Sequence, residues 1–137
     1  MILCYNVVNI LKTSTLNFAE EAKIMKVAIV GSRGLQVEDF APYLPENTTE
    51  IVSGGAKGID TCAAEYARTH SLALTEFKPD YRRFGRGAPL KRNVEIVDYA
   101  DLVLVFWDGA SRGSRFVIDA CRRAGKNCIV IEMPPMR

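Results

Sequence analysis

Ser53-Gly54-Gly55-Ala56-Lys57-Gly58-Ile59-Asp60 is the stretch of this chain from which the fold is most directly inferred. It follows the short apolar run Ile51-Val52 and leads into a segment with helical periodicity, so it is predicted to be a strand-to-helix junction. Three glycines and two small residues allow the backbone there to approach another group closely. Because the start of a helix presents free N–H groups and a partial positive charge, that group is most simply an anion. The alternative is a tight turn without a ligand, in which Asp60 only stabilises the first helical turn.

Short apolar runs alternate with segments of helical period along the rest of the chain. Strands are predicted at residues 27–30, 51–52, 72–77, 102–106 and 128–131. Helices are predicted at residues 37–44, where Pro45 ends the segment, and at 59–67, 90–97 and 116–124, with a loop at 78–88. Strands that are apolar on both faces and alternate with helices predict an α/β fold. We expect an open, mostly parallel five-stranded Rossmann-like sheet with helices on both faces.

Length and composition limit the classes of protein to consider. A chain of 137 residues, 48% hydrophobic and 25% charged, is expected to form one domain with its own core. Its net charge of +2 is too small by itself to indicate a nucleic-acid-binding protein. Four cysteines without a CxxC pair indicate free thiols in a reducing cytoplasm. With a single histidine, a zinc site is not expected. No other metal site and no cofactor are predicted, and no apolar run is long enough to span a membrane.

The domain is predicted to span residues 25–137, because Met25-Lys26 directly precedes the first strong strand. Residues 1–24 are predicted to be an N-terminal extension whose role the sequence leaves open. The near-helical spacing of Leu3, Val7 and Ile10 leaves it open whether this extension docks on the domain.

Ligands of open parallel sheets bind beyond the carboxyl ends of the strands. The loops at those ends are residues 31–36, 53–58, 78–88 and 107–113, and they carry the unusual residues of the chain. Gly31-Ser32-Arg33-Gly34 offers a tight turn, a hydroxyl and a planar guanidinium for a phosphate or carboxylate. The alternative for this loop is a polar turn with a solvated arginine. Neither the GxGxxG dinucleotide pattern nor the Walker phosphate-loop pattern is present.

The third loop is basic and the fourth is rich in hydroxyls. Residues 78–93 hold six basic residues and one acid, with Tyr81 and Phe84 between them. That mixture suits a polyanion with stackable bases, and the alternative is a solvated surface loop. In residues 107–114, Ser111 or Ser114 is predicted to cap the following helix. With an anion present, the two serines and the local N–H groups would form a phosphate cradle.

Few residues of the chain could carry out catalysis. No Ser-His-Asp set or Cys–His pair is apparent, because His70 falls at the far end of its predicted helix. The acids near the strand ends are Asp60, Asp80 and Asp108. Hydrolytic chemistry would depend on these, and Asp60 and Asp108 are the candidate catalytic residues.

Four ordered motifs between about Lys26 and Ile131 resemble the SLOG superfamily of Rossmann-like proteins. Val27-Ala28-Ile29-Val30-Gly31-Ser32-Arg33 is similar to the opening of its DprA branch, and residues 53–60 resemble the SGxAxGID element of that branch. Arg92-Asn93 matches the RN pair of the same branch. Residues 109–114 resemble the second glycine motif of the superfamily, with Ser114 in place of the usual threonine. The chain looks most like the small standalone, YspA-related members.

The resemblance implies that a nucleotide or nucleotide derivative binds at the strand ends, and that the protein is a homodimer. The LOG branch contains phosphoribohydrolases that cleave the base from nucleoside monophosphates, using a glutamate three residues after the threonine of the second motif. Val117 stands at that position here, which weakens the case for hydrolysis. The DprA branch binds single-stranded DNA and lines the strand ends with Lys and Arg residues.

Two hypotheses follow from the residues and the resemblance together. In the first, the domain binds a nucleoside monophosphate or an ADP-ribose-like molecule. Any enzymatic activity would then be N-glycosidic hydrolysis of a nucleoside monophosphate, with Asp60 or Asp108 stabilising positive charge on the sugar. In the alternative, the loop at 78–92 binds single-stranded DNA. The predicted ligand-binding residues are Gly31, Ser32, Arg33, Gly54, Gly55, Ala56, Lys57, Gly58, Arg92, Asn93, Gly109, Ser111, Gly113 and Ser114.

Overall fold

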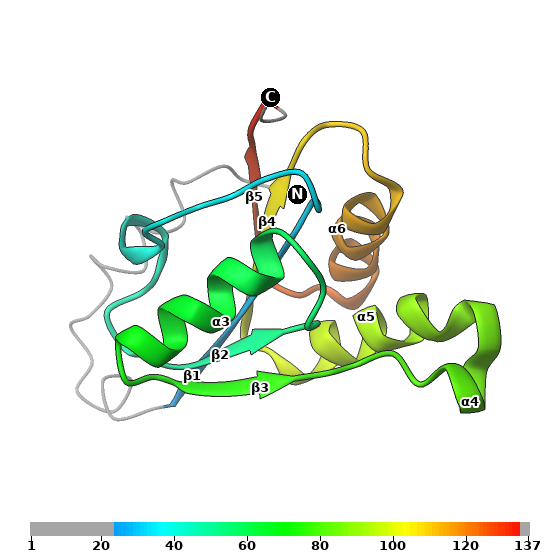
Figure 1. The fold of residues 1–137 in the computed structure, drawn as a ribbon, viewed down its shortest axis with the longest axis horizontal. Helices are drawn as coiled ribbons and strands as arrows, with labels where there is room; N and C mark the ends of the chain where they lie inside the picture. The colour runs from blue at the N-terminus through cyan, green and yellow to red at the C-terminus, as the bar shows by residue number, and fades with distance from the viewer. Residues whose placement is uncertain (1–23, 135–137) are drawn as a thin grey trace.

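One open sheet of five parallel strands forms the centre of the protein in the computed structural model, which describes residues 24–134. The strand order is β3-β2-β1-β4-β5, and each neighbouring pair is parallel (Figure 1). The strands are β1 (Met25–Gly31), β2 (Thr48–Ser53), β3 (Ala73–Glu76), β4 (Leu102–Trp107) and β5 (Cys128–Glu132). The predicted α/β fold with a parallel Rossmann-like sheet is confirmed.

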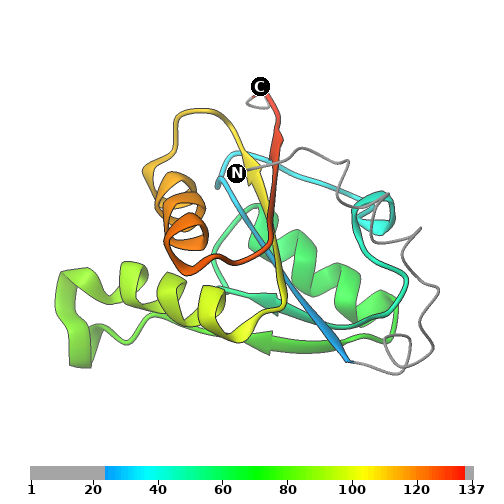
Figure 2. The same ribbon diagram turned by 180° about the vertical axis from the view of Figure 1, so that it is seen from behind.

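In the part of the chain that the structure describes, three helices cover the sheet on its two faces. Helix α3 (Ile59–Thr69) lies on one face, and α5 (Ala88–Tyr99) and α6 (Arg112–Ala124) lie on the other. Figure 1 shows α3 in front of the sheet, and Figure 2 shows α5 and α6 from the opposite side. Alternate β1 residues divide between two cores, since Val27 and Ile29 pack with α3 whereas Ala28 and Val30 pack with α5 and α6.

The connection from β1 to β2 contains no α-helix, so the helix predicted at residues 37–44 is wrong. Only a 3₁₀ turn, η1 (Ala41–Tyr43), forms there. Pro42 supplies the physical reason, because it has no N–H to donate and its ring disfavours helix in the preceding turn. The segment still buries Phe40, whose ring meets Tyr66 and Phe106 edge-on at centroid distances of 5.6 and 5.4 Å. The segment between β1 and β2 therefore covers the same face of the sheet as α3, although it forms no α-helix.

The segment predicted as a loop at residues 78–88 contains two short turns of helix instead. They are α4 (Tyr81–Phe84) and the 3₁₀ helix η2 (Gly85–Gly87), and they extend from the body of the domain just before α5 (Figure 1). The carboxylate of Asp80 caps α4 by accepting the N–H of Arg83 at 3.1 Å. A capping signal at Asp80 was therefore present in the sequence.

The chain reverses its direction across the sheet at β1. It moves outward through β2 and β3 on one side, then returns to place β4 and β5 on the other side. A crevice forms at such a switch point, beyond the carboxyl ends of the two strands that diverge. Here those strands are β1 and β4, whose ends meet where Gly31 pairs with Phe106.

The remaining sequence-based expectations concern the N-terminal extension, the cysteines, metal binding and membrane spans. The N-terminal extension and Cys4 lie outside the described residues, whereas Cys62, Cys121 and Cys128 are free thiols. Within residues 24–134, no group of three or more His, Cys, Asp or Glu side chains is placed to hold a metal ion. No helix in that range is long and apolar enough to cross a membrane.

Candidate functional site

A cleft of about 250 Å³ opens at the switch point, above the carboxyl end of β1. It is bounded by the first turns of α3, α5 and α6, and three of the four loops singled out in the sequence, those at residues 31–36, 53–58 and 107–113, contribute to its lining. Its lining residues are Val30, Gly31, Ser32, Arg33, Ala56, Asp60, Pro89, Leu90, Arg92, Asn93, Ser111, Gly113, Ser114 and Val117. Most of the predicted site residues thus lie together.

Three serine hydroxyls form one end of the cleft, which we call the serine cluster (Ser32, Ser111 and Ser114). The Ser32 hydroxyl lies 2.7 Å from the Ser111 hydroxyl and 3.4 Å from the Ser114 hydroxyl. Ser32 is only 2% exposed, and its Oγ also accepts the N–H of Asp108 at 3.1 Å. Its own N–H donates to Phe106 O at 3.0 Å, which extends the β1–β4 ladder into the loop. Ser32 therefore joins the loops that follow β1 and β4.

The start of α6 faces the cleft without a side-chain cap. Ser111 occupies the N-cap position as predicted, but its hydroxyl turns to Ser32 and makes no cap hydrogen bond. The first turn of α6 contains no acidic residue. Apart from the adjacent residues and the backbone of α6, no described atom lies within 4 Å of where a Cβ of Gly113 would stand. The indole N–H of Trp107 donates to Ser111 O at 3.1 Å and holds this turn in place. The free N–H groups of α6 are thus available to an anion.

Asp108 stabilises the loop before α6. Its Oδ1 accepts the N–H groups of Ser111 and Ala110 at 2.8 and 2.9 Å, and these bonds lower the pKa of the carboxyl group. Gly109 follows it with a φ of +84°, which the turn requires. Neither Asp108 nor Gly109 lines the cleft. Their contacts hold in place the loop that carries Ser111 of the serine cluster.

Asp60 is the carboxylate that reaches the cleft. It is 5% exposed, lies in the first turn of α3, and its Oδ2 accepts the N–H of Ala56 at 3.2 Å. Burial raises the pKa of Asp60, although the Ala56 bond and the nearby Arg92 guanidinium act in the opposite direction. The glycine-rich junction thus already contains an acceptor for its backbone N–H groups, which is the carboxyl group of Asp60.

Arg92 links the ends of β2 and β3 to α5. Its Nη1 donates to the carbonyl of Gly54 and, at 3.3 Å, to that of Phe77. A Cβ on Gly54 would stand 2.7 Å from Arg92 Nη1 and 2.9 Å from Asp60 Oδ2. Gly54 is therefore needed because two charged side chains close over its backbone.

Asn93 contributes an amide at the same end of the cleft. Its Oδ1 accepts from Arg92 Nε at 2.8 Å, which fixes the orientation of the amide because only the oxygen can accept. The side chain is 9% exposed, and its Nδ2 donates to no residue in the range 24–134. It is therefore a hydrogen-bond donor left free at the cleft.

Some predicted ligand residues hold the loops together and do not line the cleft. Gly58 has a φ of +78°, and a Cβ there would overlap the carbonyl of Arg33, so the first two loops touch at this point. Gly54, Gly55 and Lys57 are likewise absent from the lining, and Lys57 is exposed.

Sequence reasoning missed four apolar residues of the cleft: Val30, Pro89, Leu90 and Val117. Val30 and Val117 are 6% and 2% exposed and close its base, whereas Leu90 is 45% exposed at its edge. The signal for Val117 was its place one turn after Ser114 on the face of α6 that packs on the sheet.

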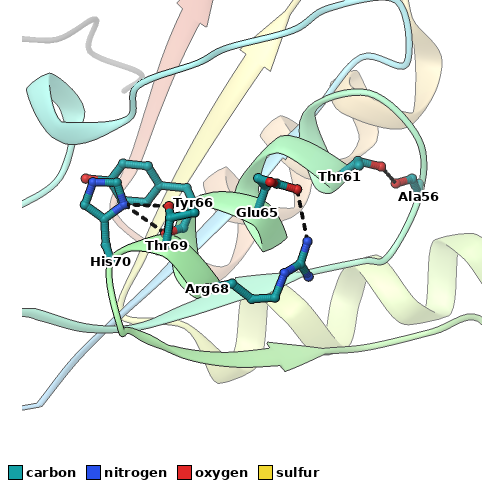
Figure 3. Close-up of polar contacts among 7 residues, drawn as sticks. All are labelled: Ala56, Thr61, Glu65, Tyr66, Arg68, Thr69 and His70. Carbon is teal, nitrogen blue, oxygen red and sulfur yellow. Dashed lines mark hydrogen bonds and ion pairs between the residues drawn. The ribbon is translucent and has the colours of Figure 1, made fainter.

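The two ends of α3 differ in their contacts, as Figure 3 shows. Near the cleft, the Thr61 hydroxyl donates to Ala56 O at 3.0 Å. At the other end, the ring of His70 stacks on Tyr66 at a centroid distance of 3.8 Å, with its Nδ1 3.0 Å from Tyr66 O. His70 is therefore remote from the cleft, as its position in the sequence predicted.

The fold and cleft are those of a doubly wound α/β domain with a crevice at its switch point. A family model described as the YspA, cpYpsA-related SLOG family (YAcAr) matches residues 25–84. The match supports membership of the SLOG superfamily, which the motifs predicted, and it indicates nucleotide-related binding without specifying a ligand. The match ends before α5 and α6, so it includes the junction with Asp60 but not the serines of α6. Neither a search of curated proteins nor a search of solved structures gave a match.

Proposed function

We propose that the cleft binds a phosphorylated nucleotide or nucleotide derivative, such as a nucleoside monophosphate or ADP-ribose. The observation that carries this proposal is the start of α6, which has no side-chain cap and no acid in its first turn. It lies in the same cleft as a buried carboxylate and a free amide donor, those of Asp60 and Asn93.

The phosphate is assigned to α6 rather than to α3 on electrostatic grounds. Asp60 places a carboxylate in the first turn of α3, where it would repel a phosphate once ionised. At α6 the N–H groups, the hydroxyls of Ser111 and Ser114, and the partial positive charge of the helix act together on an anion. The exposed guanidinium of Arg33, also in the lining, adds a positive charge to the same cleft.

Thermal denaturation with and without AMP or ADP-ribose tests the proposal. A ligand at 100 times its Kd adds about 2.7 kcal/mol to the free energy of unfolding. For a domain of this size that corresponds to a rise in Tm of roughly 10 °C. We expect Arg33→Ala to reduce the rise, and Arg122→Ala, which removes an exposed arginine in the last turn of α6, to leave it unchanged. If no nucleotide at millimolar concentration raises Tm, the proposal is wrong.

Hydrolysis of the bound nucleotide is a separate question. Within the described part of the chain, Asp60 is the one acid that lines the cleft, and the apolar Val117 lies where the LOG enzymes have a glutamate. We therefore propose binding as the main function and assign the stabilisation of any positive charge on the sugar to Asp60. Incubation with AMP, followed by chromatography for free adenine, measures such activity, with Asp60→Asn as the variant that would abolish it.

A second candidate function is binding of single-stranded DNA by residues 78–92, whose first part, residues 78–87, we call the basic arm. The arm projects from the domain, and its Arg82, Arg83 and Arg86 side chains are exposed (Figure 1). Tyr81 is 61% exposed and could stack on a base. A gel-shift assay with a single-stranded oligonucleotide would show affinity that falls steeply with salt if this candidate is correct. Arg82→Glu combined with Arg83→Glu would abolish the shift without altering the binding of AMP.

We also propose that the protein is a homodimer, and this proposal rests on the resemblance to SLOG proteins alone. Sedimentation velocity at micromolar concentration distinguishes a dimer from a monomer of 15.2 kDa.

A further inference from the structure

We propose that the cleft recognises the ribose 5-phosphate part of its ligand and leaves the base outside. The proposal rests on the proposed function and goes beyond it, because it states which chemical groups of a nucleotide are read. It follows from three properties of the cleft: the spacing of its polar groups, a free donor beside a buried carboxylate, and the lack of a surface that reads a base.

The polar side chains in the cleft form two separate groups. The serine cluster lies at the ends of β1 and β4, whereas Asp60, Arg92 and Asn93 gather at the end of β2. Since β2 and β4 flank β1 and neighbouring strands lie about 4.8 Å apart, the two groups are roughly 5 to 10 Å from each other. A single pentose with a phosphate on its terminal carbon spans a gap of that size.

The group at β2 suits neighbouring hydroxyls. Both Asp60 and Asn93 are more than nine-tenths buried, and both line the cleft. The Asp60 carboxylate has about four acceptor sites, and the N–H of Ala56 is bound to one of its oxygens. The Nδ2 of Asn93 donates to no residue in the described range. Because a hydroxyl both donates and accepts, a vicinal diol can satisfy the two side chains together.

The remainder of the cleft offers little that would identify a base. Among residues 24–134, the lining contains no aromatic side chain on which a base would stack. Gly31 and the apolar Val30 and Val117 also line the cleft, and none of them offers a polar side chain to a base. The cleft volume, about 250 Å³, is slightly below the range of about 300–1,000 Å³ that is usual for small-molecule sites. With the sugar and phosphate inside, the base would lie at the edge against Leu90, which is 45% exposed.

Isothermal titration calorimetry of the full chain with a panel of ligands tests this inference. The panel is AMP, CMP, ribose 5-phosphate, adenosine, 2′-deoxy-AMP and 3′-deoxy-AMP. We expect AMP, CMP and ribose 5-phosphate to bind with Kd values within about tenfold of one another, and adenosine to bind at least 100-fold more weakly. At least one of the two deoxy nucleotides would bind about tenfold more weakly than AMP, because a hydroxyl partner is lost.

Variants of residues at the two ends of the proposed ligand position distinguish recognition of the sugar from recognition of the base. Asn93→Asp keeps the oxygen that accepts from Arg92 but removes the donor, so it would weaken AMP and ribose 5-phosphate equally. Asn127→Asp, at an exposed position, is the matched control. Leu90→Ala would weaken AMP about threefold and leave ribose 5-phosphate unchanged.

The outcomes that would overturn the inference differ from those that would overturn the proposed function. If AMP binds but ribose 5-phosphate does not, or if AMP and CMP differ by more than 100-fold, the base is read and the inference is wrong. If none of the phosphorylated ligands binds, the proposed function is wrong and the inference falls with it.

Discussion

Replacing Gly54 with alanine tests the way in which the buried end of the cleft is packed. A Cβ at this position would stand 2.7 Å from Arg92 Nη1, 3.0 Å from Arg92 Cζ and 2.9 Å from Asp60 Oδ2. Contacts this short are not tolerated, so the guanidinium of Arg92 must move. Its hydrogen bonds to the carbonyls of Gly54 and Phe77 would then be lost or lengthened.

The cost of this substitution can be estimated from these contacts. Overpacking of a well-packed site costs about 1–3 kcal/mol, and the loss of a hydrogen bond from a charged donor costs about 1.5–3 kcal/mol. Because Gly54 is not among the glycines with positive φ, no gain or loss from backbone strain is added. Part of the two costs is shared, so we expect Gly54→Ala to lower the free energy of unfolding by about 2–4 kcal/mol. At about 4 °C per kcal/mol, Tm falls by roughly 8–16 °C.

Urea denaturation followed by circular dichroism measures this change, and Gly34→Ala is the matched control. Apart from the adjacent residues, no atom in the range 24–134 lies within 4 Å of where a Cβ on Gly34 would stand, so that variant is expected to stay within about 0.5 kcal/mol of the wild type. Arg92→Ala removes the colliding guanidinium, so the double variant Gly54→Ala/Arg92→Ala would cost less than the sum of the two single changes. The reasoning is refuted if Gly54→Ala is as stable as Gly34→Ala, or if the two changes are additive.

Three further changes probe the loops and their charges. Burial raises the pKa of Asp60 above its ordinary value of 3.8. Between these two pKa values the folded state binds more protons than the unfolded state, so the free energy of unfolding falls as pH rises. Asp60→Asn would remove that fall, as seen in urea denaturation at several pH values above 3.8. Ser32→Ala would cost about 1–3 kcal/mol, since it leaves the N–H of Asp108 without its acceptor. Gly58→Ala would cost more than Gly125→Ala in thermal denaturation, because both have positive φ but only the Cβ at Gly58 meets other atoms.

Each of these three expectations has a contradicting result. Parallel stability curves for the wild type and Asp60→Asn above pH 3.8 would show that the carboxyl group titrates normally. An unchanged Tm for Ser32→Ala would show that the serine cluster does not hold the loops together. Equal losses for Gly58→Ala and Gly125→Ala would show that backbone strain, rather than contact with the first loop, accounts for the cost.

The alternation of apolar runs and helical segments was enough to predict the sheet and most of its helices. Every predicted strand is present, and the helices predicted near residues 59–67, 90–97 and 116–124 correspond to α3, α5 and α6. The failure at residues 37–44 has a local cause, since Pro42 restricts the segment to one 3₁₀ turn. The spacing of its apolar residues suggested one face of a helix. The structure instead buries Leu35, Phe40 and Leu44 in the core from a segment without an α-helix.

The sequence could also place the candidate site at the strand ends but could not say how each residue is used. Ser32, Asp60 and Ser114 were selected as rim residues, and all three line the cleft. Asp108 was selected on the same grounds, yet its carboxylate is bound to the N–H groups of its own loop. A sequence gives the type of a side chain and its loop, but hydrogen-bond partners depend on which way that loop turns.

Local sequence determined the strands, the helix starts and the small residues that a close backbone approach requires, because these depend on neighbours a few positions away. The tertiary structure alone decided that Asp60 fills the glycine-rich junction, that α6 remains uncapped, and that Asn93 keeps a free donor. The Ser32–Ser111 and Arg92–Gly54 contacts that bring these groups into one cleft join residues 79 and 38 positions apart, and those residues meet only when parallel strands bring their carboxyl ends to one edge of the sheet.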